Sequence, residues 1–224
     1  MSFINRVVID GATGFVGTWM REMAPRGVDI YAFSKKGYDT GIIDTMSMTH
    51  IVHLANIAPT RAIEAAKRNG ARLLYCSSGA VYDQQNEYAD NKRAWEVECR
   101  ASGVDVVIAR LFTFYGKGID SHKAIHQFYK SVIEGRPLQV WGDGSTVRSY
   151  MHGSQLGRAL WQLLFEGVNG EAYDVGSTRP TTTLRLAQRI SAFTGSKIEF
   201  VDKQITNPYY MPNQEMLWYN KLTK

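Results

Sequence analysis

A parallel β-sheet with helices on both faces, the doubly wound α/β class, is the architecture expected of this 224-residue chain. Short apolar segments alternate with segments of helical character, as in chains built from repeated strand–helix units. The apolar segments are continuous rather than alternately polar, which is typical of strands buried on both faces. A glycine-rich turn joins the first of these segments to the first helical one, as in folds that hold a dinucleotide at this place.

The first half contains the expected strands and the helices between them. Strands are expected at 6–10, 29–33, 51–55, 72–77 and 104–110, and helices at 15–24, 60–69 and 87–102. After residue 115, glycines and prolines separate shorter elements. We expect helices at about 122–134, 155–165 and 182–193 and a strand at 171–175, with Thr182 or Thr183 as the N-cap of the last helix. Residues 1–115 are therefore interpreted as a dinucleotide-binding core. Residues 116–224 are interpreted mostly as a substrate-binding region packed on it, from which some segments return to the core.

Composition and charge exclude several classes of protein. The net charge is +5, but no basic run is longer than a pair such as Lys35-Lys36, so no concentrated basic patch indicates nucleic-acid binding. No apolar run reaches the roughly 18 residues of a membrane span, and no secretory leader is visible, so a cytoplasmic location without membrane contact is expected. Cys76 and Cys99 lack the spacing of a metal site and are interpreted as small core residues; no metal is expected.

The glycine motif occupies residues 11–17, GATGFVG, directly after a strand and at the start of a helix. The first glycine permits a tight turn, the second lets backbone N–H groups approach a diphosphate, and the third permits close packing of helix on strand. A glycine-rich turn without a ligand is the alternative. The residues of this motif expected at the cofactor are Gly11, Thr13, Gly14, Phe15, Val16 and Gly17.

The end of the second strand bears on the choice between NAD and NADP. An acid often binds the ribose 2′-hydroxyl there, but this chain has Ser34 followed by Lys35 and Lys36. A hydroxyl next to cations suits a 2′-phosphate, which favours NADP. The alternative is that the two lysines are solvated loop charges.

A serine, a tyrosine and a lysine follow in a spacing that carries chemistry. Ser78 stands at a strand end, and Tyr88 and Lys92 are four residues apart on one face of the next helix. A free phenol has a pKa of about 10, and a nearby ammonium favours its ionised form. The lysine can also donate to ribose hydroxyls, while the serine holds the reacting oxygen. Taken alone, a Tyr-x-x-x-Lys pair is common by chance, but here it follows the glycine turn and a Ser-Ser strand end.

With these motifs in order, the chain resembles the extended short-chain dehydrogenases/reductases of the nucleotide-sugar epimerase/dehydratase branch, which have a Rossmann-type fold. The resemblance covers most of the chain, at residues 11–17 (GATGFVG), 53–55 (HLA), 77–82 (SSGAVY), 88–92 (YADNK), 110–118 (RLFTFYGKG), 142–152 (GDGSTVRSYMH) and 173–177 (YDVGS). It implies Ser78, Tyr88 and Lys92 as the catalytic set. It places Asp44, Leu54 and Ala55, besides Tyr88 and Lys92, at NAD or NADP, and Ser78, Thr113 and Arg148 at a nucleotide-sugar substrate. A homodimer through the helices near 60–69 and 87–102 is also implied.

Departures from the family pattern leave the substrate open. The chain is shorter than typical members, Thr113 stands for the usual asparagine, and Ser149, Ser154 and Gln155 stand where acids are common. Gly79 and Ala80 follow Ser78, where dehydratases carry an acid, so a dehydratase is the less expected activity. An epimerase that transfers hydride transiently is narrowly preferred to an NADPH-dependent keto-sugar reductase. A dinucleotide-binding scaffold or redox sensor without turnover is the third hypothesis.

Overall fold

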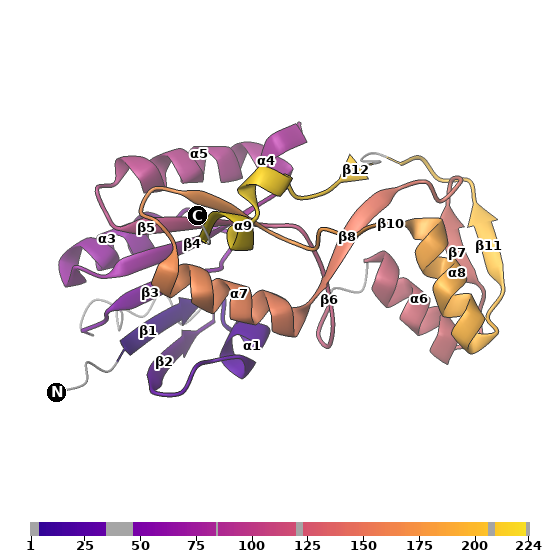
Figure 1. The fold of residues 1–224 in the computed structure, drawn as a ribbon, viewed down its shortest axis with the longest axis horizontal. Coiled ribbons are helices and arrows are strands. Elements are labelled where there is room, and N and C mark those ends of the chain that lie inside the picture. Colours follow the sequence, from indigo (N-terminus) through magenta and orange to yellow (C-terminus); the bar gives the residue numbers. More distant parts are fainter. Residues whose placement is uncertain (1–4, 35–46, 84, 120–122, 206–208, 223–224) are drawn as a thin grey trace.

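The computed structural model describes residues 5–34, 47–83, 85–119, 123–205 and 209–222. They form a larger lobe that contains both ends of the described chain and a smaller lobe beside it (Figure 1). No helix among the described residues is both long and apolar enough to cross a membrane.

Six parallel strands make up the sheet of the larger lobe, as the sequence predicts. Each pair of neighbours is parallel, in the order β2-β1-β3-β4-β5-β9. The strands are β1 (Asn5–Asp10), β2 (Val28–Phe33), β3 (His50–His53), β4 (Arg72–Ser78), β5 (Val106–Leu111) and β9 (Ala172–Val175). The last strand comes from the second half of the chain, so segments far apart in sequence build one sheet.

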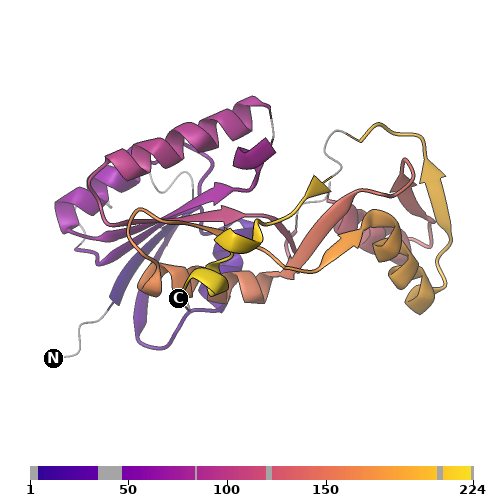
Figure 2. The same cartoon turned by 45° about the horizontal axis from the view of Figure 1, so that its top comes forward.

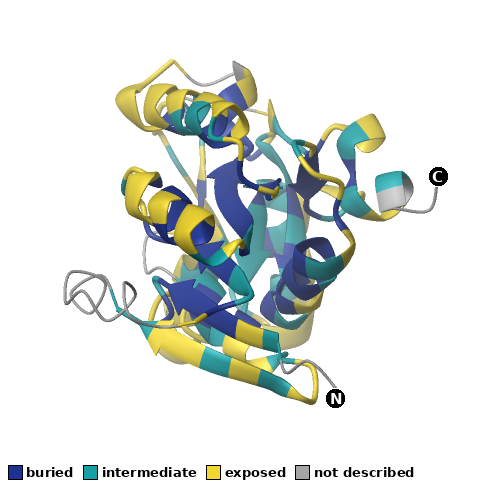
Figure 3. Ribbon diagram, turned by 90° about the vertical axis from the view of Figure 1, so that its left-hand side faces the viewer, coloured by how far each residue is buried: buried dark blue, intermediate teal, exposed yellow. Residues whose placement is uncertain are grey.

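Helices cover both faces of this sheet (Figure 1). On one face α1 (Phe15–Glu22) packs against α7 (Gly153–Glu166), and apolar residues of both helices share a core with the sheet. On the other face α3 (Thr60–Asn69) and α5 (Glu87–Ala101) enclose a second core, which includes Cys99. Figure 3 shows the central strands and the inner helix faces buried. Both cysteines are free and buried, which confirms their interpretation as core residues.

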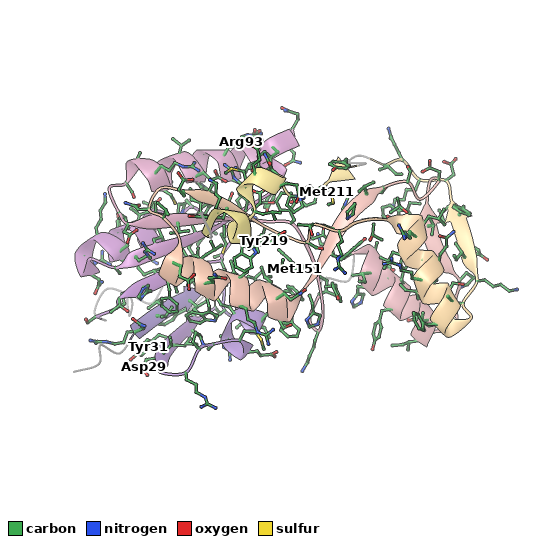
Figure 4. All side chains as sticks on the ribbon, viewed as in Figure 1. Asp29, Tyr31, Arg93, Met151, Met211 and Tyr219 are labelled. Atoms are coloured by element: carbon green, nitrogen blue, oxygen red, sulfur yellow. The ribbon has the colours of Figure 1, made fainter. Side chains whose placement is uncertain are left out.

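The prediction that all five early strands are buried on both faces is wrong for β2. This strand lies at the edge of the sheet, and no described strand pairs with its outer side. Asp29 and Tyr31 of β2 are exposed, and Figure 4 shows both at the outer edge of the lobe. The apolar composition of 29–33 could not distinguish an edge strand from a central one, because position in the sheet depends on distant partners.

Element boundaries differ from the sequence prediction by a few residues. The strand expected at 51–55 is β3, which ends at His53, because the N–H groups of Leu54 and Ala55 donate to a side chain instead of a neighbouring strand. The last long helix, α8 (Thr183–Thr194), begins after Thr182, whose hydroxyl accepts from the Arg185 N–H at 3.0 Å. Thr182 is thus the N-cap.

The smaller lobe contains short strands that the sequence analysis missed. In one sheet β8 (Val147–His152) pairs with β6 (Thr113–Tyr115), β10 (Pro180–Thr182) and β12 (Tyr209–Tyr210), while β7 (Leu138–Trp141) pairs with β11 (Ile198–Val201). α6 (Ala124–Ile133) and α8 pack around a small core of Phe128, Leu138, Val140 and Ala187. Figure 2 shows this lobe joined to the larger one along β8 and β10. The short helices α4 (Ala80–Asp83) and α9 (Trp218–Leu222) belong to the larger lobe.

Candidate active site

The glycine turn between β1 and α1 forms a close-packed backbone cradle. Gly11 has a φ of +63°, and a Cβ there would lie 3.0 Å from the Ala55 nitrogen. A Cβ on Gly17 would lie 2.5 Å from the Ala12 Cα, so helix and strand approach too closely for a side chain. α1 begins after Gly14 with no side-chain cap, so no capping side chain competes with an anion for its first N–H groups. The turn therefore fits the diphosphate of a dinucleotide, as its sequence predicts.

Asp10, the residue before this turn, organises the loop that follows β3. Its side chain is fully buried; Oδ1 accepts the N–H groups of Leu54 and Ala55, both at 2.8 Å, and Oδ2 bonds His53 Nδ1. His53 Nε2 lies 3.0 Å from the Ile57 carbonyl. Asp10 thus holds the 53–57 loop against the glycine turn. Sequence analysis missed it, although an acid directly before the first glycine was a visible signal.

Removal of the Asp10 side chain should destabilise the protein and weaken dinucleotide binding. In Asp10→Ala, each buried N–H left without a partner costs about 1–3 kcal/mol. Asp10→Asn is the matched control, because its amide oxygen can accept both N–H groups while its NH₂ donates to an unprotonated His53 Nδ1. Urea unfolding should therefore show a much larger loss of stability for the alanine variant than for the asparagine variant. Calorimetric titration with NAD should show a much larger loss of affinity. Equal losses in the two variants would contradict this role.

Ser78, Tyr88 and Lys92 meet at the carboxyl end of β4. Ser78 ends that strand and is buried, while Tyr88 lies in the first turn of α5, where Asn86 caps the helix by accepting from the Ala89 N–H at 2.9 Å. Lys92 is only 3% exposed, and its Nζ donates to the Cys76 carbonyl at 3.1 Å. The same Nζ lies 5.9 Å from the centroid of the Tyr88 ring. Burial lowers the pKa of Lys92.

A cleft of about 1010 Å³ between the lobes is lined by Ser78, Tyr88 and Lys92 and by other residues that the sequence analysis placed at the cofactor or the substrate. It is lined by Phe15, Val16, Leu54, Ser78, Tyr88, Lys92, Thr113 and Arg148. The glycine turn with Thr13, and Ala55, lie beside it. Ser34 follows β2 next to the turn, since the Ala12 N–H donates to the Phe33 carbonyl at 3.0 Å. Lys35 and Asp44 lie outside the described residues.

The charged side chains among the described lining residues of this cleft are all cationic. Among its described lining residues five are cationic and none is a carboxylate. Four of the five, Lys123, Arg136, Arg148 and Lys203, come from the smaller lobe and its connections. Such a lining concentrates anionic ligands. No group of three or more metal-ligating side chains occurs in the described part of the chain.

Comparison with known proteins identifies the family. A model described as "NAD dependent epimerase/dehydratase family" matches residues 46–176, more than half of the chain. The chain belongs to this family.

Curated relatives agree with this assignment. The chain is 31% identical over 183 residues to a trifunctional UDP-glucose 4,6-dehydratase/epimerase/reductase of Arabidopsis thaliana, covering 69% of this chain and 27% of the relative. It is 33% identical over 161 residues to a dTDP-glucose 4,6-dehydratase of Streptomyces niveus, covering 62% and 47%. The chain thus spans less than half the length of these curated relatives.

The fold matches those of solved structures at lower identity. A dTDP-glucose 4,6-dehydratase of Bacillus anthracis in complex with NAD has a TM-score of 0.84 at 19% identity, covering 98% of this chain and 91% of that one. A UDP-glucuronic acid 4-epimerase of Bacillus cereus with UDP-glucuronic acid and NAD has a TM-score of 0.82 at 16% identity, covering 96% and 93%. These likenesses establish the Rossmann-type fold that the sequence predicts.

A buried polar network behind the site was missed by sequence analysis. Glu96 follows Tyr88 and Lys92 at the same four-residue spacing on α5 and accepts from Ser77 Oγ at 2.7 Å. It also binds Arg110 through two nitrogens, at 2.9 and 2.7 Å. Arg110 donates to the Tyr82 hydroxyl at 2.8 Å, and that hydroxyl donates to Asp174 at 2.9 Å. The network ties α5, β4, β5 and β9 together, and the four-residue spacing was the signal that could have found it.

Asp174 should make stability depend on pH. It is fully buried, and burial raises its pKa to about 6 although the Asn213 N–H and the Tyr82 hydroxyl donate to it. The folded state therefore binds this proton more tightly than the unfolded one, whose pKa is about 3.9. Its contribution to stability is fully present below pH 4 and is lost as the pH rises to about 6, by roughly 3 kcal/mol.

Asp174→Asn removes this titration. The difference in the free energy of unfolding between the variant and the wild type should shift in favour of the variant as the pH rises from 4 to about 7. Urea unfolding of both proteins across this range measures it. A difference that stays constant with pH would show that the carboxyl group does not titrate there.

Proposed function

We propose that the chain is an NAD(P)-dependent epimerase that acts on a nucleotide sugar by transient hydride transfer. The observation that carries this proposal is the meeting of Ser78, Tyr88 and Lys92 on a cleft whose other charged lining residues, among those described, are all cations. Such a cleft suits a substrate that carries a diphosphate. In this proposal the larger lobe binds the dinucleotide and the smaller lobe binds the nucleotide part of the substrate, with Arg148 on its diphosphate.

Each residue of the catalytic set has a separate role. Gly11, Gly14, Gly17 and the start of α1 would hold the dinucleotide, which supplies the hydride acceptor and donor when it is bound. Tyr88 takes the proton of a sugar hydroxyl as that carbon is oxidised to a ketone, and returns it when the ketone is reduced on its other face. The Lys92 ammonium stabilises the charge on Tyr88, and Ser78 donates a hydrogen bond to the reacting oxygen.

The surroundings of Ser78 support an epimerase over a dehydratase. A dehydratase needs an acid that protonates the leaving hydroxyl. A Cβ on Gly79 would overlap the Phe112 ring, so a side chain there requires rearrangement, and the next residue, Ala80, is 2% exposed. Since the described lining of the cleft contains no carboxylate, no described Asp or Glu is placed to supply that acid.

An NADPH-dependent keto-sugar reductase is the second candidate. The observation that favours it is Ser34 directly after β2, a residue with a hydroxyl rather than an acid, next to the point where the Ala12 N–H of the glycine turn donates to the Phe33 carbonyl. An acid there would repel the 2′-phosphate of NADP, and a hydroxyl does not.

The experiment that separates these activities follows sugar and cofactor together. The purified protein is incubated with NAD or NADPH and a panel of UDP- and dTDP-hexoses and their 4-keto derivatives, and products are identified by NMR. An epimerase converts one hexose into its epimer without net change of cofactor, whereas a reductase consumes NADPH in proportion to product. Loss of water from the sugar would establish a dehydratase instead. No binding of either dinucleotide in a thermal-shift titration would overturn all three.

A further inference from the structure

A second tyrosine reaches the catalytic serine from the C-terminal part of the chain. Tyr210 lies in β12, opposite Arg148 of β8, and lines the same cleft as Ser78. Its hydroxyl oxygen is 3.2 Å from Ser78 Oγ and 3.2 Å from the Leu111 carbonyl oxygen. Nothing in the motifs around Ser78, Tyr88 and Lys92 points to this residue, because it is 132 positions away from Ser78 in sequence.

The directions of these hydrogen bonds follow from the number of protons available. A carbonyl oxygen only accepts, so the single proton of Tyr210 is donated to Leu111. The Tyr210 oxygen must then accept the proton of Ser78, whose own oxygen accepts from the Ala80 N–H at 3.2 Å. In this structure Ser78 therefore donates its proton to the Tyr210 oxygen, which lies beside the position that the proposed function gives to the reacting oxygen of the sugar.

The rest of the Tyr210 side chain spans the region between Ser78 and Arg148. Its ring centroid is 5.0 Å from that of Phe112, and the Arg148 guanidinium carbon lies 5.8 Å from the Tyr210 centroid. The phenol thus extends from the serine to the cation assigned to the diphosphate. Burial raises the pKa of Tyr210 to about 12, which suits a hydroxyl that donates a hydrogen bond.

We propose that Tyr210 is a further residue of the reaction site, whose hydroxyl bonds the reacting sugar oxygen together with Ser78. This rests on the proposed function. When the sugar binds, its reacting oxygen accepts the Ser78 proton in place of the Tyr210 oxygen and lies next to the Tyr210 hydroxyl. Tyr210 then donates its own proton to that oxygen instead of to the Leu111 carbonyl. Because both hydroxyls act on one atom, the effect of Tyr210 depends on Ser78.

A double-mutant cycle tests this dependence. Tyr210→Phe, which keeps the ring and its packing, is combined with Ser78→Ala, and the rate of epimer formation from the panel of UDP- and dTDP-hexoses is followed by NMR. Loss of one such hydrogen bond should slow Tyr210→Phe about tenfold, whereas in the Ser78→Ala background the same change should have little effect. Tyr209→Phe is the matched control, since Tyr209 is the exposed neighbour in β12 and should behave as wild type.

The outcomes separate this proposal from the one on which it rests. A wild-type protein that binds dinucleotide but converts no sugar nucleotide of the panel overturns the proposed function and this role with it. A wild type that is active, with Tyr210→Phe equally active or slowed by the same factor in both backgrounds, overturns the role of Tyr210 alone. Unchanged dinucleotide affinity and melting temperature in Tyr210→Phe exclude a purely structural effect.

Discussion

Tyr88→Phe should abolish nearly all turnover and leave dinucleotide affinity unchanged. The substitution removes only the hydroxyl that exchanges a proton with the sugar, a contribution of about 10²–10⁴-fold in rate. Tyr88 is 43% exposed in the first turn of α5, so loss of its hydroxyl leaves no buried group without a partner. The expected result is a large fall in kcat with an unchanged melting temperature.

Tyr129→Phe is the control for this prediction. Tyr129 lies on α6 of the smaller lobe, is 65% exposed and does not line the cleft, so its variant should keep full activity. Steady-state kinetics on the sugar nucleotide and calorimetric titration with the dinucleotide measure the two effects separately. Full activity of Tyr88→Phe would show that another group moves the proton.

The parts of the fold that local patterns determine could be predicted from the sequence. β1, β4 and the helices between the strands have continuous apolar runs or helical spacing, and the Thr182 cap is a local hydrogen bond. The edge position of β2 and the short strands of the smaller lobe depend on partners far along the chain. β12 has only two residues and pairs with β8, which lies about sixty positions earlier, so no local pattern indicates it.

The same distinction applies to the candidate site. Tyr88 and Lys92 are four residues apart and Gly11–Gly17 is one short motif, so spacing alone was enough to select them. Asp10 and Glu96 act through residues on other elements, and Tyr210 reaches Ser78 only after the chain has passed through the smaller lobe. Sequence therefore selects the groups proposed for the chemistry, whereas the groups that position them emerge from the three-dimensional contacts.

Glu96→Ala should be among the most destabilising single substitutions in this protein. Glu96 is 3% exposed and forms a two-pronged ion pair with Arg110, whose side chain is 15% exposed. Hydrogen bonds from Arg110 and Ser77 hold the pKa of Glu96 below its ordinary value even though burial opposes this. Removal of one partner from a buried ion pair leaves an uncompensated charge and costs about 3–5 kcal/mol. Urea unfolding should show this loss.

Two further variants distinguish loss of the buried charge of Glu96 from the effect of any substitution on α5. Asp90→Ala lies on the same helix but breaks an exposed pair with Arg93, which is worth at most about 0.5 kcal/mol. Glu96→Gln keeps the shape and can still accept from Ser77, so it should be less destabilised than Glu96→Ala. Because Glu96 is one turn beyond Lys92, the glutamine variant should still fold but hold Tyr88 and Lys92 less firmly against Ser78, which predicts a fall in kcat larger than the change in KM. If Glu96→Ala is no more destabilised than Asp90→Ala, the network does not fix α5 on the sheet.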